Sequence, residues 1–536
     1  MRGALGNAFR TNVPQQCPRV FSQPPTNRER GVVPHPTDVY DERRMRMRSL
    51  TALPALLTAA ILAAPAPSGD PMNPRPVRLT VVASDSRGAP VDDLTVNDFQ
   101  ILDAEKPQSI TLFRHWDNKP QPAVGLEPGE VSNRAAGVTH ATIILFDLLN
   151  ENFAARGGAQ SYLLRGLKSL EAADGLYLYF LTLDGRLYPV HGMPGAGGVG
   201  AAPAAAVPWT QDSKTIEQAI RKMFGVGRAE INIDTRVRMT YRVLGEVARL
   251  LAAVPGQKNI VWITHGVPNM LGAQGSIGVS QPIDYTPLLQ KLVATLDRIG
   301  VSIYPVQQAP AGMALDGSLG GTGSEETLRQ FALLTGGSFK VSSEIAAAVR
   351  QAMNQGSNSY LLGYTPAAAN WDGRFHKLHV ATARKGVRLQ FKTGYTALND
   401  AGDNEADVLQ DALRSSFDAA EIGVRGRLTP VSGNTMRLEC RIDPADIQMS
   451  QTGARITAHL ALQGEGIKPN GEIEQTSITP LDLSWTAEQR AAMASGGIKF
   501  VQTIPVNAGW TKVRLAVLDR GTHLLGSVTI PIDAQR

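Results

Sequence analysis

The chain has 536 residues, 43% of them hydrophobic and 19% charged, a composition typical of globular proteins and not of disordered chains. Its formal net charge of +5 would point to nucleic acid or anionic membranes. However, residues 1–66 hold nine Arg and four acidic residues, and the rest of the chain carries basic and acidic side chains in equal numbers. Because the residues after 66 have no formal net charge, they produce no overall electrostatic attraction for phosphate backbones. We therefore expect no nucleic-acid partner.

Residues 1–66 are predicted to be a leader that ends in a signal peptide. Two Arg residues precede an uncharged apolar stretch at 50–64, and small residues and Pro follow it, which is the layout of a secretory signal. We expect the signal peptide to start at Met45 or Met47. The apolar stretch is too short to cross a bilayer comfortably. The sequence therefore predicts a secreted or periplasmic protein with no membrane span in the mature chain.

The segment at 77–116 is predicted to form β structure, because short alternating runs are separated by turn residues. Residues 117–137 are rich in Pro, Gly and Asn and indicate a linker.

Between residues 138 and 356, apolar strands alternate with helical stretches, which favours a doubly wound, mainly parallel, Rossmann-like sheet. Strands are predicted at 141–146, 176–182, 259–264, 301–306 and 338–341. Helices are predicted at 159–171, 214–224, 235–254, 287–299, 325–335 and 344–354. A turn at Asp184–Gly185 would add an antiparallel edge strand after the second of these strands.

The remaining third of the chain is again rich in strands. We predict a β segment at 357–397, an acidic linker with a short helix at 398–421, and an immunoglobulin-like β-sandwich at 422–536. Each β segment beside the α/β domain has only about three strands, few for an independent domain. We therefore expect 77–116 and 358–397 to form one β unit into which the α/β domain is inserted.

Two motifs that suggest ligands have simpler interpretations. "GAGGVG" at 195–200 matches a dinucleotide-binding pattern, but Pro203 and Pro208 follow where a helix should begin, so a flexible loop is the better interpretation. His376 and His379 resemble a metal pair, but on a strand residues three apart point to opposite faces. We expect two ordinary histidines.

The segment "FDLLNE" carries the most information about function. Asp147 follows a buried strand, and Thr264–His265–Gly266 follows the strand predicted to lie beside it. In such a sheet both loops meet at the carboxyl edge, where ligands bind. Asp147 also has a structural alternative, because its carboxylate could cap the next helix or accept loop N–H groups.

At these residues the chain resembles a known family, the von Willebrand factor A (VWA) domains, and more closely the secreted bacterial VWFA-related proteins. The resemblance rests on "FDLLNE", "QKNIVWITHGV" and "LRQFALLTGGSFKV". It also rests on flanks such as "VVASDSRGAPVDDLTVNDFQILDAEKPQSITLF" and "YLLGYTPAAANWDGRFHKLHVATARKGVRLQFKTGY". It covers about residues 77–397 and implies an A-type recognition domain.

The resemblance also implies a metal-ion-dependent adhesion site, which that family builds from D-x-S-x-S, a Thr and a second Asp. The two Ser positions become Leu149 and Glu151, and the second Asp becomes His265. The implied ligands here are Asp147, Asn150, Glu151, Thr235 and His265, around a divalent cation, Mg²⁺ or Mn²⁺. Leu149 offers no oxygen, and His265 suits a transition metal better than Mg²⁺.

The expected function is that of a secreted, non-enzymatic, adhesion-type binding protein that meets a protein or a cell-surface or matrix partner at the carboxyl edge. The candidate contacts are the loops at 147–157, 192–208, 228–236 and 266–284. One alternative is a metal-dependent hydrolase that uses Asp147, Glu151 and His265. Another is an envelope scaffold with no specific ligand.

Overall fold

The computed structural model describes residues 76–117, 125–134, 140–151, 156–170, 175–193, 213–224, 231–271, 282–307, 322–342, 345–367, 370–398, 405–415 and 417–532. The predicted leader, the "GAGGVG" motif and large parts of the four candidate contact loops lie outside these ranges. Among the described helices, none has the length and apolar character needed to cross a membrane.

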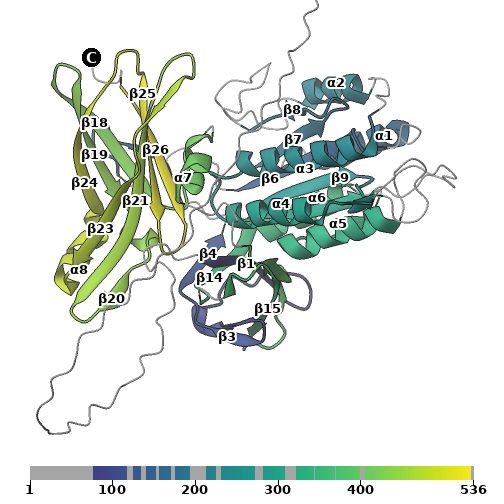
Figure 1. The fold of residues 1–536 in the computed structure, drawn as a ribbon, viewed down its shortest axis with the longest axis horizontal. Coiled ribbons are helices and arrows are strands. Elements are labelled where there is room, and N and C mark those ends of the chain that lie inside the picture. The colour runs from purple at the N-terminus through teal and green to yellow at the C-terminus, as the bar shows by residue number, and fades with distance from the viewer. Residues whose placement is uncertain are drawn as a thin grey trace, which may run out of the picture. The chain divides into compact units, whose positions relative to one another are not determined.

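The α/β domain is built on a mainly parallel sheet. Within the described residues its strand order is β13-β12-β9-β6-β7-β8 (Figure 1). The strands are β6 (Ala141–Asp147), β7 (Leu176–Leu181), β8 (Leu187–His191), β9 (Lys258–Thr264), β12 (Val301–Gln307) and β13 (Lys340–Val341). All neighbours are parallel except β7 and β8. Gly185 has a φ of 73° in the turn before β8, so the predicted antiparallel edge strand is confirmed.

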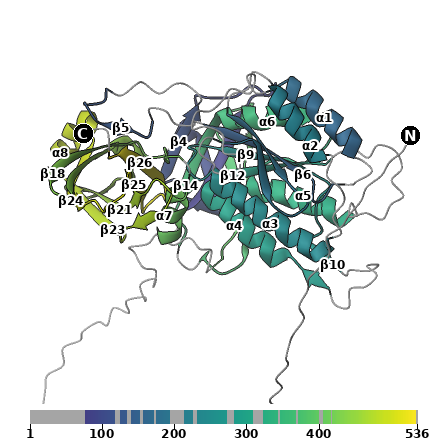
Figure 2. The ribbon, with the colours of Figure 1, turned by 90° about the horizontal axis from the view of Figure 1, so that it is seen from above.

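Helices cover both faces of this sheet, as Figure 2 shows from above. They are α1 (Arg156–Lys168), α2 (Ser213–Phe224), α3 (Ile233–Leu250), α4 (Thr286–Ile299), α5 (Thr322–Thr335) and α6 (Ile345–Ser357). Residues of α3, α4 and α5 pack in one hydrophobic cluster, and residues of α1, α2 and α6 pack in the cluster on the other face. Every residue of β6 and β9 is buried, as expected for central strands covered on both sides. A short hairpin of β10 (Met270–Leu271) and β11 (Ile283–Asp284) follows β9.

The two segments that flank the α/β domain pair with each other. The first contributes β1 (Val77–Ser84), β2 (Phe99–Asp103), β3 (Lys106–Gln108) and β4 (Leu112–Asp117). The second contributes β14 (Asn358–Tyr364), β15 (Phe375–Thr382), β16 (Arg388–Gln390) and β17 (Gly394–Thr396). In the described part of the chain they form two four-stranded sheets, β16-β1-β14-β4 and β17-β15-β2-β3, that share one hydrophobic cluster. The strand pairing is the one expected if the α/β domain is inserted into a single β unit.

The C-terminal part also contains two sheets. After α7 (Glu405–Leu413) come β18 (Val424–Ser432), β19 (Thr435–Ile442), β20 (Ser450–Thr452), β21 (Arg455–Ile467), β22 (Ile473–Gln475), β23 (Thr479–Trp485), α8 (Ala487–Gly496), β24 (Ile498–Pro505), β25 (Lys512–Asp519) and β26 (Leu525–Pro531). Side chains from both sheets enter a common hydrophobic cluster. The predicted linker before the α/β domain contributes β5 (Val131–Ser132), which pairs with β18. An immunoglobulin-like type for this part stays a prediction.

Candidate functional site

Asp147 is the last residue of β6, the strand that lies between β7 and β9 in the sheet. It therefore lies at the carboxyl edge, where the sequence placed it. Its side chain is completely buried. Burial raises the pKa of Asp147, and hydrogen bonds to its carboxylate oppose that rise.

Donors surround both oxygen atoms of this carboxylate. The Asn150 backbone N–H donates to Oδ1 at 3.0 Å. Within the described chain, Oδ2 accepts from three side-chain groups, Asn150 Nδ2 at 2.8 Å, Thr264 Oγ1 at 2.8 Å and Trp262 Nε1 at 3.1 Å. The hydrogen bond from the Asn150 backbone N–H is of the kind expected if Asp147 has a structural role and accepts N–H groups of the loop. These hydrogen bonds oppose the effect of burial on the carboxylate and satisfy both of its oxygens without a metal ion.

The helix α3 contributes to this network through Thr240 and not through Thr235. Asn150 Nδ2 donates to Thr240 Oγ1 at 2.8 Å, and Thr240 Oγ1 donates to the Arg236 carbonyl at 2.8 Å. Thr235 lies in the first turn of α3, where its backbone N–H donates to the Asn232 side chain at 2.8 Å. Positions five residues apart on a helix point about 140° apart, so the two threonines lie on different faces.

Glu151 and His265 come together as the resemblance implies, but they form an ion pair. Glu151 Oε1 lies 3.3 Å from His265 Nδ1, without hydrogen-bond alignment, and the Glu151 side chain has no exposed surface. Burial lowers the pKa of His265, but the Glu151 and Asp147 carboxylates outweigh burial, so the pKa is raised. The neighbouring carboxylates therefore favour protonation of His265, which competes with metal ligation by its ring nitrogens.

The residues present do not fit the implied Mg²⁺ or Mn²⁺ site. Leu148 and Leu149 are buried, each in the hydrophobic cluster on a different face of the sheet. Both oxygens of Asp147 already accept hydrogen bonds, and Thr235 is not part of the network. Among the described residues, no group of three or more His, Cys, Asp or Glu side chains is arranged to hold a metal ion. The hydrolase alternative gains no support from this geometry.

The two histidines of "FHKLH" lie on opposite faces of β15, as the sequence predicted. His376 is buried, and its Nδ1 lies 3.0 Å from Asp103 Oδ1. The Tyr364 and Tyr395 hydroxyls donate to Asp103 Oδ2 at 2.9 and 3.0 Å. His379 is exposed on the other face. The cluster around Asp103 holds the two sheets of the β unit together and has the character of a buried polar network.

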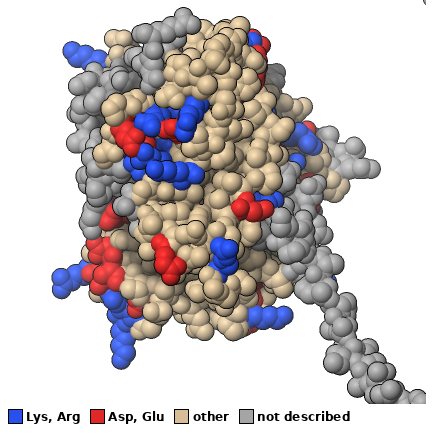
Figure 3. Space-filling view, turned by 90° about the vertical axis from the view of Figure 1, so that its left-hand side faces the viewer, with Lys and Arg blue, Asp and Glu red and all other residues tan. Residues whose placement is uncertain are grey.

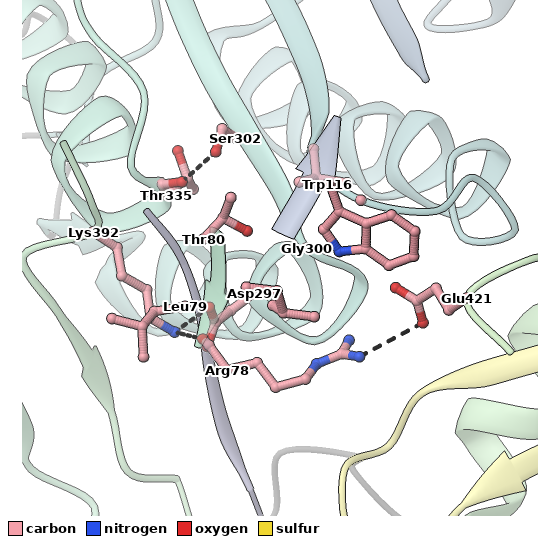
Figure 4. Close-up of a pocket in the computed structure, with 13 residues that line it drawn as sticks. Arg78, Leu79, Thr80, Trp116, Asp297, Gly300, Ser302, Thr335, Lys392 and Glu421 are labelled. Atoms are coloured by element: carbon pink, nitrogen blue, oxygen red, sulfur yellow. Dashed lines mark hydrogen bonds and ion pairs between the residues drawn. The ribbon is translucent and has the colours of Figure 1, made fainter. Parts of the chain in front are cut away.

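A small cavity with both polar and apolar lining residues lies at the opposite, amino edge of the α/β sheet (Figure 4). Its volume is about 30 Å³, which is enough to hold ordered water but no larger ligand. Figure 4 shows Arg78 of β1 pointing toward Glu421 and Lys392 pointing toward Asp297. Lys258, at the start of β9, reaches the same Glu421 carboxylate at 3.4 Å. These contacts join the α/β domain, the β unit and the segment before β18.

The chain matches no protein-family model and no curated protein sequence. Among solved structures it is similar to an aerotolerance-related membrane protein from Bacteroides fragilis, with 14% identity over 40% of this chain and 98% of that one, at a TM-score of 0.23. It is also similar to the pilus adhesin SpaC from Lactobacillus rhamnosus, with 12% identity, coverage of 87% and 58%, and a TM-score of 0.25. It is similar as well to the human COPII-coat protein Sec24c, with 11% identity over 59% of this chain and 45% of that one, at a TM-score of 0.26. These low scores carry no argument about function, and the VWA resemblance stays a prediction.

Proposed function

We propose that this chain is a secreted, non-enzymatic binding protein that recognises a protein or a surface polymer at the carboxyl edge of its A-type domain, without a metal ion. The observation that carries the proposal is the enclosure of Asp147. Its carboxylate accepts hydrogen bonds from Asn150, Trp262 and Thr264, so it is occupied by the protein itself. A group held in this way supports the shape of the edge and is not free to act on a substrate.

The hairpin that follows His265 supports a role for this edge in recognition. Met270 on β10 is 51% exposed, a large exposure for an apolar side chain. The hairpin has a fixed base, because the buried Tyr285 donates its hydroxyl to Asp234 Oδ1 of α3 at 2.8 Å. An exposed apolar residue on a fixed base suits binding, because little conformational freedom is lost on contact.

The test is binding of the full chain to an array of purified matrix proteins and cell-surface polysaccharides, with EDTA present. We expect binding to at least one class, and at least tenfold weaker binding of the Met270→Glu variant to that ligand. The matched control is Leu333→Glu, since Leu333 is 53% exposed near the C-terminal end of α5. An equal loss of ligand binding in the Met270→Glu and Leu333→Glu variants would contradict the proposal. Binding that requires a divalent cation would contradict it too. No binding to any class would favour the scaffold alternative.

Calorimetry with Mg²⁺, Mn²⁺, Ca²⁺ and Zn²⁺ separates the metal-dependent alternatives. We expect no micromolar binding at the carboxyl edge, because the Asp147 carboxylate is surrounded by donors and Leu149 offers no oxygen ligand. Glu151→Gln is the control variant, since it removes the negative charge of one implied ligand and keeps the side-chain shape. Micromolar binding of a metal ion that this substitution abolishes would instead support a metal-dependent adhesion site or a metal-dependent hydrolase.

A further inference from the structure

One sheet of the C-terminal part ends at β24, and the outer side of this strand is open. The strand order is β24-β19-β18-β5, and within the described chain β24 pairs only with β19. Lys499, Val501, Gln502 and Thr503 are all exposed, and Val501 is 50% exposed although it is apolar. Figure 3 looks at this side of the molecule, where charged side chains lie in groups on a largely uncharged surface. The free edge of β24 is therefore accessible.

The pairing with β19 shows which backbone groups of β24 face the free edge. Val506 donates its N–H to the Asn434 carbonyl at 2.7 Å, which continues the ladder between the two strands. The backbone groups of successive residues point to opposite sides of a strand. The N–H and C=O groups of Lys499, Val501 and Thr503 therefore point away from β19. A row of unpaired backbone groups is a template for a further strand.

The two ends of this row are closed in matching ways. At one end, Gly497 follows α8 and donates its N–H to the Met493 carbonyl at 2.9 Å. At the other end, Pro505 has no N–H to donate. Gly497 and Pro505 lie at equal distances in sequence before and after Val501. The row of free donors is therefore symmetric about Val501.

Other edge strands of the described sheets contain a residue that hinders strand addition. Pro107 lies within β3, Pro189 within β8 and Pro480 within β23. A proline on an edge strand removes a donor, and it is one of the devices by which native proteins protect a sheet edge. In β24 the only proline is the last residue, and the only charged residue is Lys499. The edge of β24 is therefore less protected than these three.

We propose that β24 pairs with β24 of a second copy of this chain, antiparallel and centred on Val501, so that the two sheets become one. Val501 then lies opposite its own counterpart and Lys499 lies opposite Thr503, in pairs that exchange both hydrogen bonds. No like charges meet directly, and the exposed Val501 is covered by another valine. A shift of the register by two residues would place Val501 opposite Lys499 or Thr503 instead.

A second copy suits this edge because a two-fold interface requires a surface that is complementary to itself. The row of donors centred on Val501 has this symmetry. The interface would be small, with about six main-chain hydrogen bonds, two from each of three residue pairs. Association should therefore be weak and dependent on concentration. Two chains joined in this way would present two A-type domains to a surface, which strengthens binding where both engage.

Sedimentation equilibrium of the full chain between about 1 and 100 μM tests the proposal. We expect the average mass of the wild type to rise from that of one chain toward that of two. Val501→Lys and Val501→Glu should each weaken the association at least tenfold, because like charges would then lie directly opposite. A mixture of these two variants should associate at least tenfold more tightly than either variant alone, because opposite charges would then meet.

The matched control is Val431→Lys, since Val431 is a 57% exposed valine near the end of β18. This variant should associate as the wild type does. A wild type that stays monomeric up to about 100 μM would overturn the proposal and leave the edge to a different partner. An equal loss in the Val431→Lys variant would overturn it too, and so would a mixture of the Val501→Lys and Val501→Glu chains that does not associate.

Cysteine cross-linking tests the register and does not depend on the charged variants. Val501→Cys should form a disulfide between two chains on mild oxidation, because the Cα atoms of a hydrogen-bonded pair are about 5.5 Å apart. Thr503→Cys is the control on the same face of β24, since its counterpart would lie about 13 Å away along the strands. Mass spectrometry of the non-reduced, proteolysed protein identifies the linked position. Equal cross-linking of the two variants, or none at position 501, would overturn the pairing centred on Val501.

Discussion

Four hydrogen bonds converge on the Asp147 carboxylate, counted over the described residues, and two of them come from Asn150. The position of Asp147 could be predicted, because an acid at the end of an apolar strand lies at the carboxyl edge of a parallel sheet. The proximity of His265 and Glu151 followed from the same argument. The partners Trp262 and Thr240 could not be predicted, because they depend on the register of β9 and the rotation of α3. The one available signal was Trp262 itself, since a buried indole N–H needs an acceptor.

At this scale we expect Asp147→Asn to lower the free energy of unfolding by about 1–3 kcal/mol, because one donor would lose its acceptor. Asp147→Ala should lower it by about 3–5 kcal/mol, because all the donors lose theirs. Urea unfolding of the two variants measures the difference. Asp184→Asn, at a largely exposed carboxylate, is the control and should have little effect. Equal stability of Asp147→Ala and the wild type would show that the network does not support the fold.

A second residue-scale prediction concerns the link between Trp262 and Asp147. Trp262→Phe keeps a ring against Phe331, whose centroid lies 5.6 Å away, and removes the indole N–H. We expect a loss of about 1–2 kcal/mol in the free energy of unfolding. In the Asp147→Ala background the same substitution should have a much smaller effect, since the acceptor is already absent. Additive losses in a double-mutant cycle would contradict a direct interaction.

At the scale of elements, strand and helix positions in the α/β domain could be predicted from periodicity, and the structure places them within a few residues. The clearest departure is β13, where a strand predicted at 338–341 covers only Lys340–Val341. Gly336 has a φ of 81°, and a Cβ on Gly337 would lie 1.9 Å from the Ile303 carbonyl. Close backbone contact therefore shortens the strand, which periodicity does not reveal. β5 was missed because two residues carry no periodic signal.

The pairing of β1 with β14 gives an element-scale prediction. Thr80 lies directly opposite Leu361. We expect Thr80→Cys with Leu361→Cys to form a disulfide on mild oxidation, since opposite Cβ atoms are about 5 Å apart and small shifts bring them within range. Mass spectrometry of the non-reduced protein after proteolysis measures the link. Thr80→Cys with Leu362→Cys is the control, because Leu362 faces the other side of the sheet. Equal cross-linking of the two pairs would be evidence against the register.

At the scale of the whole molecule, buried charges join parts that are far apart in sequence. Lys258 donates to the Ile299 carbonyl and to Glu421, while Glu421 also accepts from the Leu525 backbone N–H. Neither residue stood out in the sequence. In the sequence, Lys258 is only the residue before a predicted strand, and Glu421 is one of several acidic residues in its segment. Long-range ion pairs of this kind depend on how separately folded parts meet, and local patterns carry no information about that.

We expect Glu421→Gln to lower the free energy of unfolding by about 3–5 kcal/mol, because the buried Lys258 would lose the carboxylate that stabilises its charged form. Lys258→Met in the same chain should recover much of that loss. Burial would raise the pKa of Glu421, but the Lys258 and Arg78 charges outweigh it and hold the pKa below the usual 4.5. The stabilisation is therefore present above pH 4.5 and is lost as the pH falls through the folded-state pKa. Calorimetric melting between pH 6 and about pH 3 should show an acid-dependent loss that Glu421→Gln lacks, and identical pH profiles would contradict this.

The pairing of the two flanking segments has a mechanical consequence. Because β1 and β4 lie on either side of β14, strands that precede and follow the α/β domain in sequence belong to one hydrogen-bonded sheet. Tension applied between residues 76 and 398 would be carried by the ladders of the β unit and would bypass the α/β sheet until those ladders separate. The α/β domain would then keep its shape under a load that pulls on the β unit around it.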